Sequence, residues 1–300
     1  MGLPTFDELF ARMDSRRPQI AVVAAGGADP TVLRALDEAA RRGWVRPVLT
    51  GREGEIREVA SGEGVSLDAF RVVDTETPSE TAVALIHAGE AACLMKGQIP
   101  TPDLMKGVLH SERGLKSGRV IGQIVLMEIP RDGRVFLLAD TGICIAPSLD
   151  QKIGLAKSAV EIARALGVSC PAVALMAATE KVHPQMPETL DAEEILRRAA
   201  SGELGDCRVA GPMSFDLAYA VEAGQRKKLA GDVLGAADVL LFPNLLSANL
   251  TVKAIMYTAD CKFGGVLCGT TAPVVFMSRA DSVETRLRSL AYTLTLAFPG

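Results

Sequence analysis

The feature that most constrains this chain is the regular alternation of short apolar runs with longer amphipathic stretches. Apolar runs of strand length occupy residues 20–25, 45–50, 91–95 and 172–178, and helix-like stretches separate them. A run that is apolar throughout predicts a strand buried on both faces, as in a parallel sheet covered by helices. The pattern therefore predicts an α/β protein with mostly parallel sheets.

Local signals place the ends of the predicted helices. Asp29 and Pro30 form an N-cap with proline in the first turn, and residues 77–80 have the pattern of a capping box. The last helix, residues 282–294, carries Val283 and Leu287 on one face. Further helices are predicted over residues 101–110, 149–166, 191–200, 214–223 and 247–259, and further strands over residues 120–129, 134–139, 208–211, 239–243, 265–268 and 274–278.

Two adjacent strands, residues 120–129 and 134–139, break the alternation. The segment between them, Pro130-Arg131-Asp132-Gly133, is typical of a hairpin turn. A chain of 300 residues is long for one domain. We therefore expect two α/β units, with a boundary near this hairpin.

Composition limits the cellular compartments and the classes of partner that we expect for this protein. The net charge of −4 and the pI of about 5.6 argue against a nucleic-acid partner. No apolar run approaches the ~18 residues that span a bilayer, and the charged first 18 residues lack the apolar middle of a signal peptide. We expect a cytoplasmic protein without membrane contact.

The cysteines and histidines do not have the spacing of a metal site. The six cysteines are scattered and include no CxxC, so we expect reduced, mostly buried thiols. His87, His110 and His183 stand far apart. GxGxxG, GxSxG and GxxxxGK[ST] motifs are absent from the sequence. No metal and no resident cofactor are expected.

Polar residues follow several predicted strands, where open α/β sheets bind ligands. Lys96 and Gly97 place a cation beside an accessible backbone N–H, which suits an anionic group, although a surface lysine is the alternative. Asp140, Thr141 and Gly142 have the residue types that orient a substrate by hydrogen bonds, or that form an Asx turn.

A third polar group lies at a predicted helix start. Asn244, Asn249 and Lys253 supply two amides and an ammonium, which suits contact with phosphate. The alternative is ordinary helix capping, which we expect of Asn249 more than of Asn244.

The segment from Phe276 to Ser282 is the most informative. Ser278 and Arg279 stand at a strand end directly before a helix, whose free N–H groups attract anions, and the guanidinium matches phosphate. The alternative is capping by Asp281 or Ser282 with Arg279 in solvent. We favour a site, because a hydroxyl, a guanidinium, a strand end and a helix start coincide.

With these loops assembled, the sequence resembles the phosphate acetyl/butyryltransferase family, and its butyryl branch more closely. The order and spacing of the matching segments make the resemblance specific. It covers most of the chain from about Leu94. The matching segments are residues 95–97, 137–142, 145–152, 187–192, Gly211-Pro212 with Asp216, Pro243-Asn244 with Asn249 and Lys253, and residues 272–275 running into 278–282.

The resemblance implies a fold like that of isocitrate and isopropylmalate dehydrogenases, with a cleft between two domains, and a homodimer. We place domain I at residues 1–118 plus 266–300 and domain II at residues 119–265. The resemblance also implies reversible transfer of a short acyl group, acetyl or butyryl, between coenzyme A and inorganic phosphate. In the reaction that the resemblance implies, the thiol attacks the acyl phosphate directly, and coenzyme A is a substrate.

The resemblance implies roles for the residues singled out above. Ser278 hydrogen-bonds the carbonyl oxygen as negative charge develops on it, and Arg279 holds the phosphate. Asp281 is a candidate base, because the coenzyme A thiol, like a free cysteine, has a pKa of about 8.5. The substrate-contacting set is Lys96, Gly97, Asp140, Thr141, Gly142, Asn244, Asn249 and Lys253.

The sequence also departs from the family pattern. The acidic residue that acetyl-transferring relatives carry seven positions after the serine is Thr285, so the base is open between Asp281 and Glu284. Cys144 replaces an asparagine, and Gly122-Gln123 replaces Ser-His. These departures favour one alternative, a binding or regulatory protein without turnover. The other alternative is an NAD-linked decarboxylating dehydrogenase of the same fold, which would need acidic metal ligands that no Asp-rich strand end supplies.

Overall fold

The computed structural model describes residues 2–278 and 280–298. The chain divides into two compact units. Unit 1 comprises Met1–Thr5 and Val120–Lys262, and unit 2 comprises Phe6–Arg119 and Phe263–Gly300. The limits of two separate domains, drawn above from the sequence, stay a prediction.

Unit 2 is built on a mostly parallel sheet. Its strands lie in the order β3 (Arg71–Asp74), β2 (Val45–Gly51), β1 (Ile20–Ala25), β4 (Cys93–Lys96), β11 (Val274–Val275) and β10 (Lys262–Cys268). Neighbouring strands are parallel as far as β11, and β10 is antiparallel to β11.

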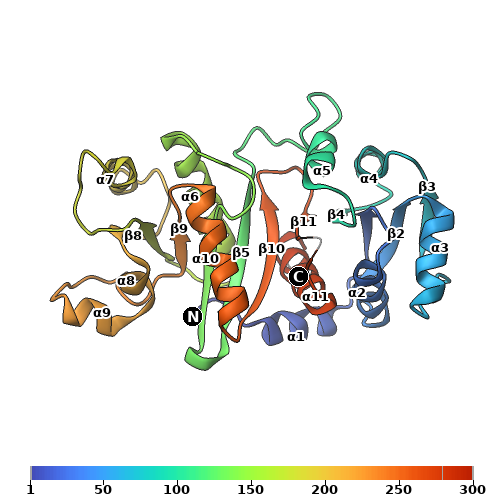
Figure 1. The fold of residues 1–300 in the computed structure, drawn as a ribbon, viewed down its shortest axis with the longest axis horizontal. Coiled ribbons are helices and arrows are strands. Elements are labelled where there is room, and N and C mark those ends of the chain that lie inside the picture. The colour runs from blue at the N-terminus through green and yellow to red at the C-terminus, as the bar shows by residue number, and fades with distance from the viewer. Residues whose placement is uncertain (1, 279, 299–300) are drawn as a thin grey trace. The chain divides into compact units, whose positions relative to one another are not determined.

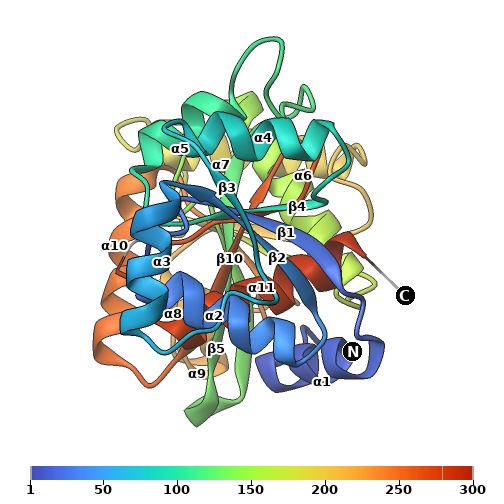
Figure 2. The same cartoon turned by 90° about the vertical axis from the view of Figure 1, so that its right-hand side faces the viewer.

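Helices cover both faces of this sheet, as the fully apolar strands require. Helices α4 (Pro78–His87) and α5 (Thr101–Val108) pack together on one face. Helices α2 (Pro30–Arg41) and α11 (Val283–Ala297) pack together on the other, with α1 (Phe6–Arg16) against α11 (Figure 2). Helix α3 (Glu53–Gly62) joins β2 to β3.

Unit 1 begins with the predicted hairpin. Strand β5 (Gly122–Ile129) pairs antiparallel with β6 (Arg134–Ala139), and the 3₁₀ turn Pro130–Asp132 joins them. Parallel strands continue the order through β9 (Val239–Leu241), β7 (Ala172–Met176) and β8 (Arg208–Met213) (Figure 1). The helices are α6 (Leu149–Ala165), α7 (Pro187–Ala200), α8 (Phe215–Tyr219), α9 (Val221–Arg226) and α10 (Leu245–Thr258).

The predicted fold class is confirmed: the protein is α/β with mostly parallel strand pairing. Its core consists mainly of Ala, Val, Leu, Ile and Met, because only 4% of the residues are aromatic. No helix in the described part of the chain is both long enough and apolar enough to cross a bilayer.

Helix starts were predicted with mixed success. Asp29 is the N-cap of α2, and its side chain accepts a hydrogen bond from the Val32 amide (2.9 Å). The capping box expected at Thr77 is wrong, because that side chain makes no capping bond. A complete capping box instead opens α6, where Ser148 and Gln151 exchange hydrogen bonds.

Several element limits differ from the prediction, and three elements were missed. The helix expected over residues 214–223 is two short helices, because Ala220 takes an extended conformation. The strand expected over residues 274–278 ends at Val275, and α7 starts four residues before the predicted Asp191. The missed elements are α1, α3 and β3.

Candidate functional site

In unit 2, two of the predicted site segments meet at one sheet edge. Strands β4 and β11 run parallel, with Leu94 opposite Val274 and Met95 opposite Val275. Lys96 ends β4, and Ser278 lies three residues beyond the end of β11, so both follow the carboxyl ends of neighbouring strands. The two segments therefore lie at the same sheet edge within this unit, and their roles in substrate binding stay a prediction.

The turn after Lys96 requires glycine. The Gly97 amide donates to the Ala25 carbonyl (2.9 Å), and the Gln98 amide donates to the Gly26 carbonyl (2.8 Å). A Cβ at Gly97 would lie 2.0 Å from the Gly26 oxygen. The close approach of two backbone segments therefore fixes the corner that follows the buried lysine, which is 1% exposed. The expectation of an accessible Gly97 N–H for an anion is wrong, because that N–H donates to Ala25.

The segment before α11 is a tight turn held by an acidic side chain. Asp281 Oδ2 accepts a hydrogen bond from the Ser278 amide (2.8 Å), and the Asp281 amide donates to the Ser278 carbonyl (3.3 Å). Asp281 is buried, whereas Ser278 is exposed. Ser282 then caps the helix by accepting a hydrogen bond from the Thr285 amide (3.3 Å). Arg279, the predicted phosphate ligand, lies outside the described residues.

The candidate bases differ in their surroundings. Glu284 has a lowered pKa, because its own backbone N–H and the Ser282 hydroxyl stabilise the carboxylate. A carboxylate with a lowered pKa is a weaker base toward a thiol. Thr285 is buried and carries no carboxyl group. The bond from the Ser278 amide gives Asp281 a role in shaping the turn.

In unit 1, the Asp140 carboxylate organises the loop that follows β6. Oδ1 accepts hydrogen bonds from the amides of Gln123 (2.8 Å), Gly142 (2.9 Å) and Ile143 (3.2 Å), and Oδ2 accepts one from Cys144 (2.6 Å). Asp140 is 3% exposed. These four bonds support the Asx-turn interpretation, in which the carboxylate shapes the loop.

Thr141 and Gly142 are enclosed beside Gln123. The Thr141 amide donates to the Gln123 carbonyl (3.2 Å), and a Cβ at Gly142 would lie 2.1 Å from Gln123 Oε1. Gln123, one of the departures from the family pattern, therefore packs directly against Gly142 and would have to move to admit a larger residue there.

Helix α10 meets this loop through its polar residues. Asn249 Nδ2 donates to the Thr141 carbonyl (3.2 Å), and Lys253 lies one turn further along the helix. Asn244 is the N-cap, since its Oδ1 accepts from the Ser247 amide (2.9 Å). The expectation that capping would fall on Asn249 more than on Asn244 is therefore wrong.

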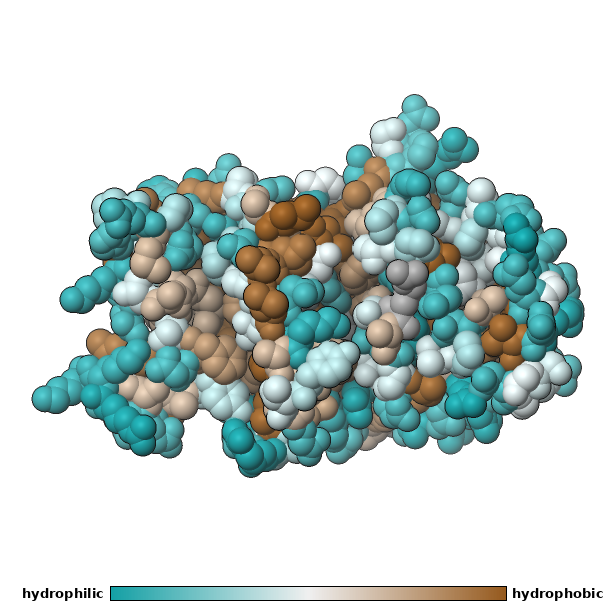
Figure 3. Space-filling view, viewed as in Figure 1, coloured by the Kyte–Doolittle hydropathy of each residue, from teal (hydrophilic) through white to brown (hydrophobic). Residues whose placement is uncertain are grey.

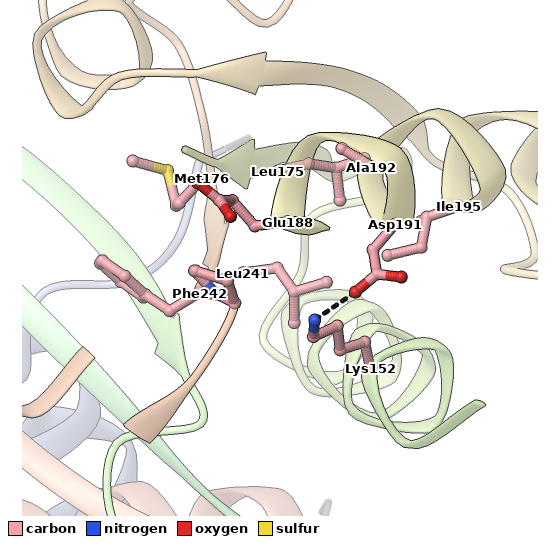
Figure 4. A pocket seen from close by; sticks show the side chains of 10 residues that line it. Lys152, Leu175, Met176, Glu188, Asp191, Ala192, Ile195, Leu241 and Phe242 are labelled. Carbon is pink, nitrogen blue, oxygen red and sulfur yellow. Dashed lines mark hydrogen bonds and ion pairs between the residues drawn. The ribbon is translucent and has the colours of Figure 1, made fainter. Parts of the chain in front are cut away.

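Two other segments that carried the resemblance also meet in unit 1. Lys152 of α6 donates to Asp191 of α7 across 2.5 Å, and the lysine side chain is 9% exposed (Figure 4). This ion pair borders a small hollow at the carboxyl ends of β7 and β9, and Glu188 points into the same hollow toward Met176. The pair ties the starts of two helices together.

In unit 2, sequence reasoning missed one charged residue that contacts the Lys96 corner, Arg286. It lies in α11 and is 1% exposed, and its Nη1 donates to the Lys96 carbonyl (3.3 Å). The signal was present, because position 286 falls on the same helix face as Val283 and Leu290. Among the residues that the structure describes, no three His, Cys, Asp or Glu side chains are grouped to hold a metal ion.

Comparison with solved structures defines the class. A branched-chain phosphotransacylase from Enterococcus faecalis V583 has a TM-score of 0.82 at 30% identity, covering 93% of this chain and 99% of that one. A 4-hydroxythreonine-4-phosphate dehydrogenase from Burkholderia phymatum has a TM-score of 0.50 at 13% identity, covering 93% and 98%, and shares the fold. The fold is thus one that phosphotransacylases share with such dehydrogenases.

Sequence comparison defines the family. The protein-family model described as phosphate acetyl/butaryl transferase matches residues 75–294 of this chain. A phosphate butyryltransferase of Clostridium acetobutylicum is 34% identical, covering 98% of this chain and 99% of the relative. A phosphate acetyltransferase of Thermotoga maritima is also 34% identical, covering 97% and 99%. The chain belongs to the phosphate acetyl/butyryltransferase family, and the predicted transferase class is confirmed.

Substitution of Asp140 distinguishes a role in shaping the loop from a role in contacting substrate. In Asp140→Asn, one amide oxygen replaces two carboxylate oxygens, and an NH₂ group faces a backbone donor. We expect a loss of about 1–3 kcal/mol in the free energy of unfolding, measured by urea denaturation.

Asp150→Asn is the matched control. Asp150 is 83% exposed and pairs with Arg198 at the surface, where an ion pair contributes at most about 1 kcal/mol. Equal effects of the two substitutions would contradict the loop-shaping role. A raised KM without lost stability in Asp140→Asn would indicate substrate contact instead.

Proposed function

We propose that this protein transfers a short acyl group reversibly between coenzyme A and inorganic phosphate. The observation that carries the proposal is the pairing of β4 with β11, which places Lys96 and Ser278 at one sheet edge. A buried cation, an exposed hydroxyl and a helix start there suit an acyl phosphate, whose phosphate needs positive charge and whose carbonyl needs a donor.

The proposed reaction is a direct displacement with both substrates bound. The coenzyme A thiol gives its proton to the proposed base, Asp281. The thiolate sulfur then attacks the carbonyl carbon of the acyl phosphate, and the carbonyl electrons move to oxygen. The Ser278 hydroxyl donates to that oxyanion. Collapse of the tetrahedral species expels phosphate, which Arg279 and Lys96 bind. The acyl group remains bonded to sulfur as acyl-CoA. Holding the two substrates in contact supplies much of the rate.

The Asp140 loop and helix α10 of unit 1 are proposed to bind substrate through Thr141, Gly142, Asn249 and Lys253. Asn244 keeps its place in the proposed set, with the capping bond as its structural role. The six free cysteines suit a reducing compartment, and we propose the cytoplasm.

The activity test is release of free thiol from acyl-CoA when phosphate is added. We expect phosphate-dependent release with at least one member of a C2 to C5 series of acyl-CoA substrates. Because both substrates bind before reaction, double-reciprocal plots of initial rate against acyl-CoA concentration, drawn at several phosphate concentrations, should intersect. Parallel lines would contradict direct attack, and no release across the series would favour a binding protein.

The roles of Ser278 and Arg279 have separate kinetic signatures. Ser278→Ala removes the oxyanion donor and should lower kcat about 10²-fold or more. Arg279→Ala should raise the apparent KM for phosphate about tenfold or more, because a charge-assisted bond is lost.

The controls for these variants are Ser201→Ala and Arg131→Ala, at exposed positions of unit 1. Both should keep the kinetics of the original protein. Near-normal turnover in Ser278→Ala would reassign the oxyanion role, and an unchanged phosphate KM in Arg279→Ala would remove that residue from the site.

We also propose a homodimer that forms through helix α10. Its inner face buries Ala248 and Val252, whereas Leu246, Leu250 and Tyr257 on the opposite face are 68%, 61% and 79% exposed. Figure 3 shows apolar residues gathered over this helix. A helix that is apolar on opposite faces is typically buried on both.

A second copy of the chain is the occupant that fits this surface. The stripe from Leu246 to Tyr257 is about 16 Å long at 1.5 Å per residue, longer than a short acyl group. A two-fold interface sets the same patch against itself, so an apolar stripe meets an apolar stripe.

The mass in solution tests the dimer. The unaltered chain should have twice the 31.6 kDa of one copy by light scattering, and Leu246→Glu with Leu250→Glu should halve that mass. Leu190→Glu, at a 42% exposed position of α7, is the control and should leave the mass unchanged. A single-copy mass for the unaltered chain contradicts the dimer, and a dimer that survives both glutamates contradicts this surface.

A further inference from the structure

Arg286 is a cation enclosed in the interior of unit 2. It is 1% exposed and is one of the largest fully buried side chains of the described chain. Burial lowers its pKa, while the negative charges of Asp29 and Asp281 act in the opposite direction. A charge in such a place is retained only when it is paired and hydrogen-bonded.

The guanidinium joins three backbone elements. Nε donates to Thr31 Oγ1 in the first turn of α2 (2.6 Å), and Nη1 donates to the Lys96 carbonyl at the end of β4 (3.3 Å). Nη2 lies 3.9 Å from Oδ1 of Asp29, the residue that caps α2. Arg286 itself belongs to α11. Only a planar fork of donors reaches these partners at once.

The arrangement leaves one donor unsatisfied. Nη2 is buried and has no hydrogen-bond partner among the described residues. An unpaired buried donor is destabilising, so Nη2 adds a cost that the other contacts of the guanidinium must offset. The hydrogen bond to the Lys96 carbonyl is one of these contacts, and it is the one that reaches the proposed site.

We propose that Arg286 is a positioning residue for phosphate binding, fixing the Lys96 carbonyl and with it the corner formed by Lys96 and Gly97. This inference rests on the proposed function, in which Lys96 binds phosphate. Because the guanidinium is enclosed, it acts through Lys96 and does not touch the substrate. The contact places the lysine against the sheet edge where Ser278 also lies.

The first test is kinetic. Arg286→Met removes the contact with Lys96 and should raise the apparent KM for phosphate about tenfold or more, since a charge-assisted bond is lost. The KM for acyl-CoA should change much less. Arg286→Lys keeps the charge but not the fork, and should give an intermediate phosphate KM. Arg288→Met, at a half-buried position on the same helix, is the control.

The second test does not need activity. The Gly97 and Gln98 amides bond to the Ala25 and Gly26 carbonyls, so their hydrogen exchange reports on the corner directly. Exchange at these two amides should accelerate in Arg286→Lys and in Arg286→Met, and not in Arg288→Met. The lysine variant serves if the methionine variant does not fold.

The outcomes are distinguishable. Unchanged exchange at Gly97 and Gln98 in a folded Arg286 variant overturns the positioning role, whatever the activity. Equal rises in both KM values, in step with lost stability, also overturn it, because they indicate a purely structural arginine. A chain that releases no thiol with any acyl-CoA, yet shows faster exchange in the variants, loses the proposed function and keeps the positioning of the corner.

Discussion

The parallel pairing of β4 with β11 is the interaction on which the proposed chemistry depends. It joins residues 94–95 to residues 274–275, some 180 positions apart in the chain. One backbone ladder therefore decides where the Lys96 corner and the Ser278 turn lie, and the side chains extend from it. Because strands in a sheet are rigid neighbours, a cation and a hydroxyl at their ends keep a fixed separation.

Buried charges in this protein mainly hold backbone in place. The Asp140 carboxylate accepts four amide bonds, Asp281 closes the turn that starts at Ser278, and Arg286 reaches the carbonyl of Lys96. A carboxylate or guanidinium offers several strong bonds from one side chain, which suits irregular loops whose amides and carbonyls have no ladder partner. In each unit, the loops that carry proposed site residues are built in this way.

The fold was predictable because its signals are local. Apolar runs such as residues 20–25 and 172–176 specify buried strands by themselves, and Asp29 with Pro30 marks a helix start. Helix α1 was missed although Phe6, Leu9 and Met13 have helical spacing, because the many charges between them hid the pattern. Helix α3 contains Gly54 and Gly62, which weaken the helix signal, and the four-residue β3 has too few positions to show a period.

The site was predictable only as a set of strand ends. Sequence order places Lys96, Asp140 and Ser278 after apolar runs, but which strands become neighbours is decided by packing over long separations. The partners of a side chain are decided in the same way. Asn244 and Asn249 look alike in sequence, yet one caps α10 and the other bonds to Thr141. Arg286 stood on an apolar helix face, where only three-dimensional contacts show what an arginine does.

The interrupted course of unit 2 along the chain has a consequence for synthesis. Residues 6–119 leave the ribosome first, but β4 receives β11 only after residue 275 has been made. Until then one edge of β4 has unpaired N–H and C=O groups, which invite pairing with another chain. Unit 1 is almost all one continuous stretch, and its synthesis is complete at Lys262, before that of unit 2. A nascent chain that has not yet reached residue 275 therefore exposes this edge of β4, and exposed strand edges are surfaces that chaperones protect.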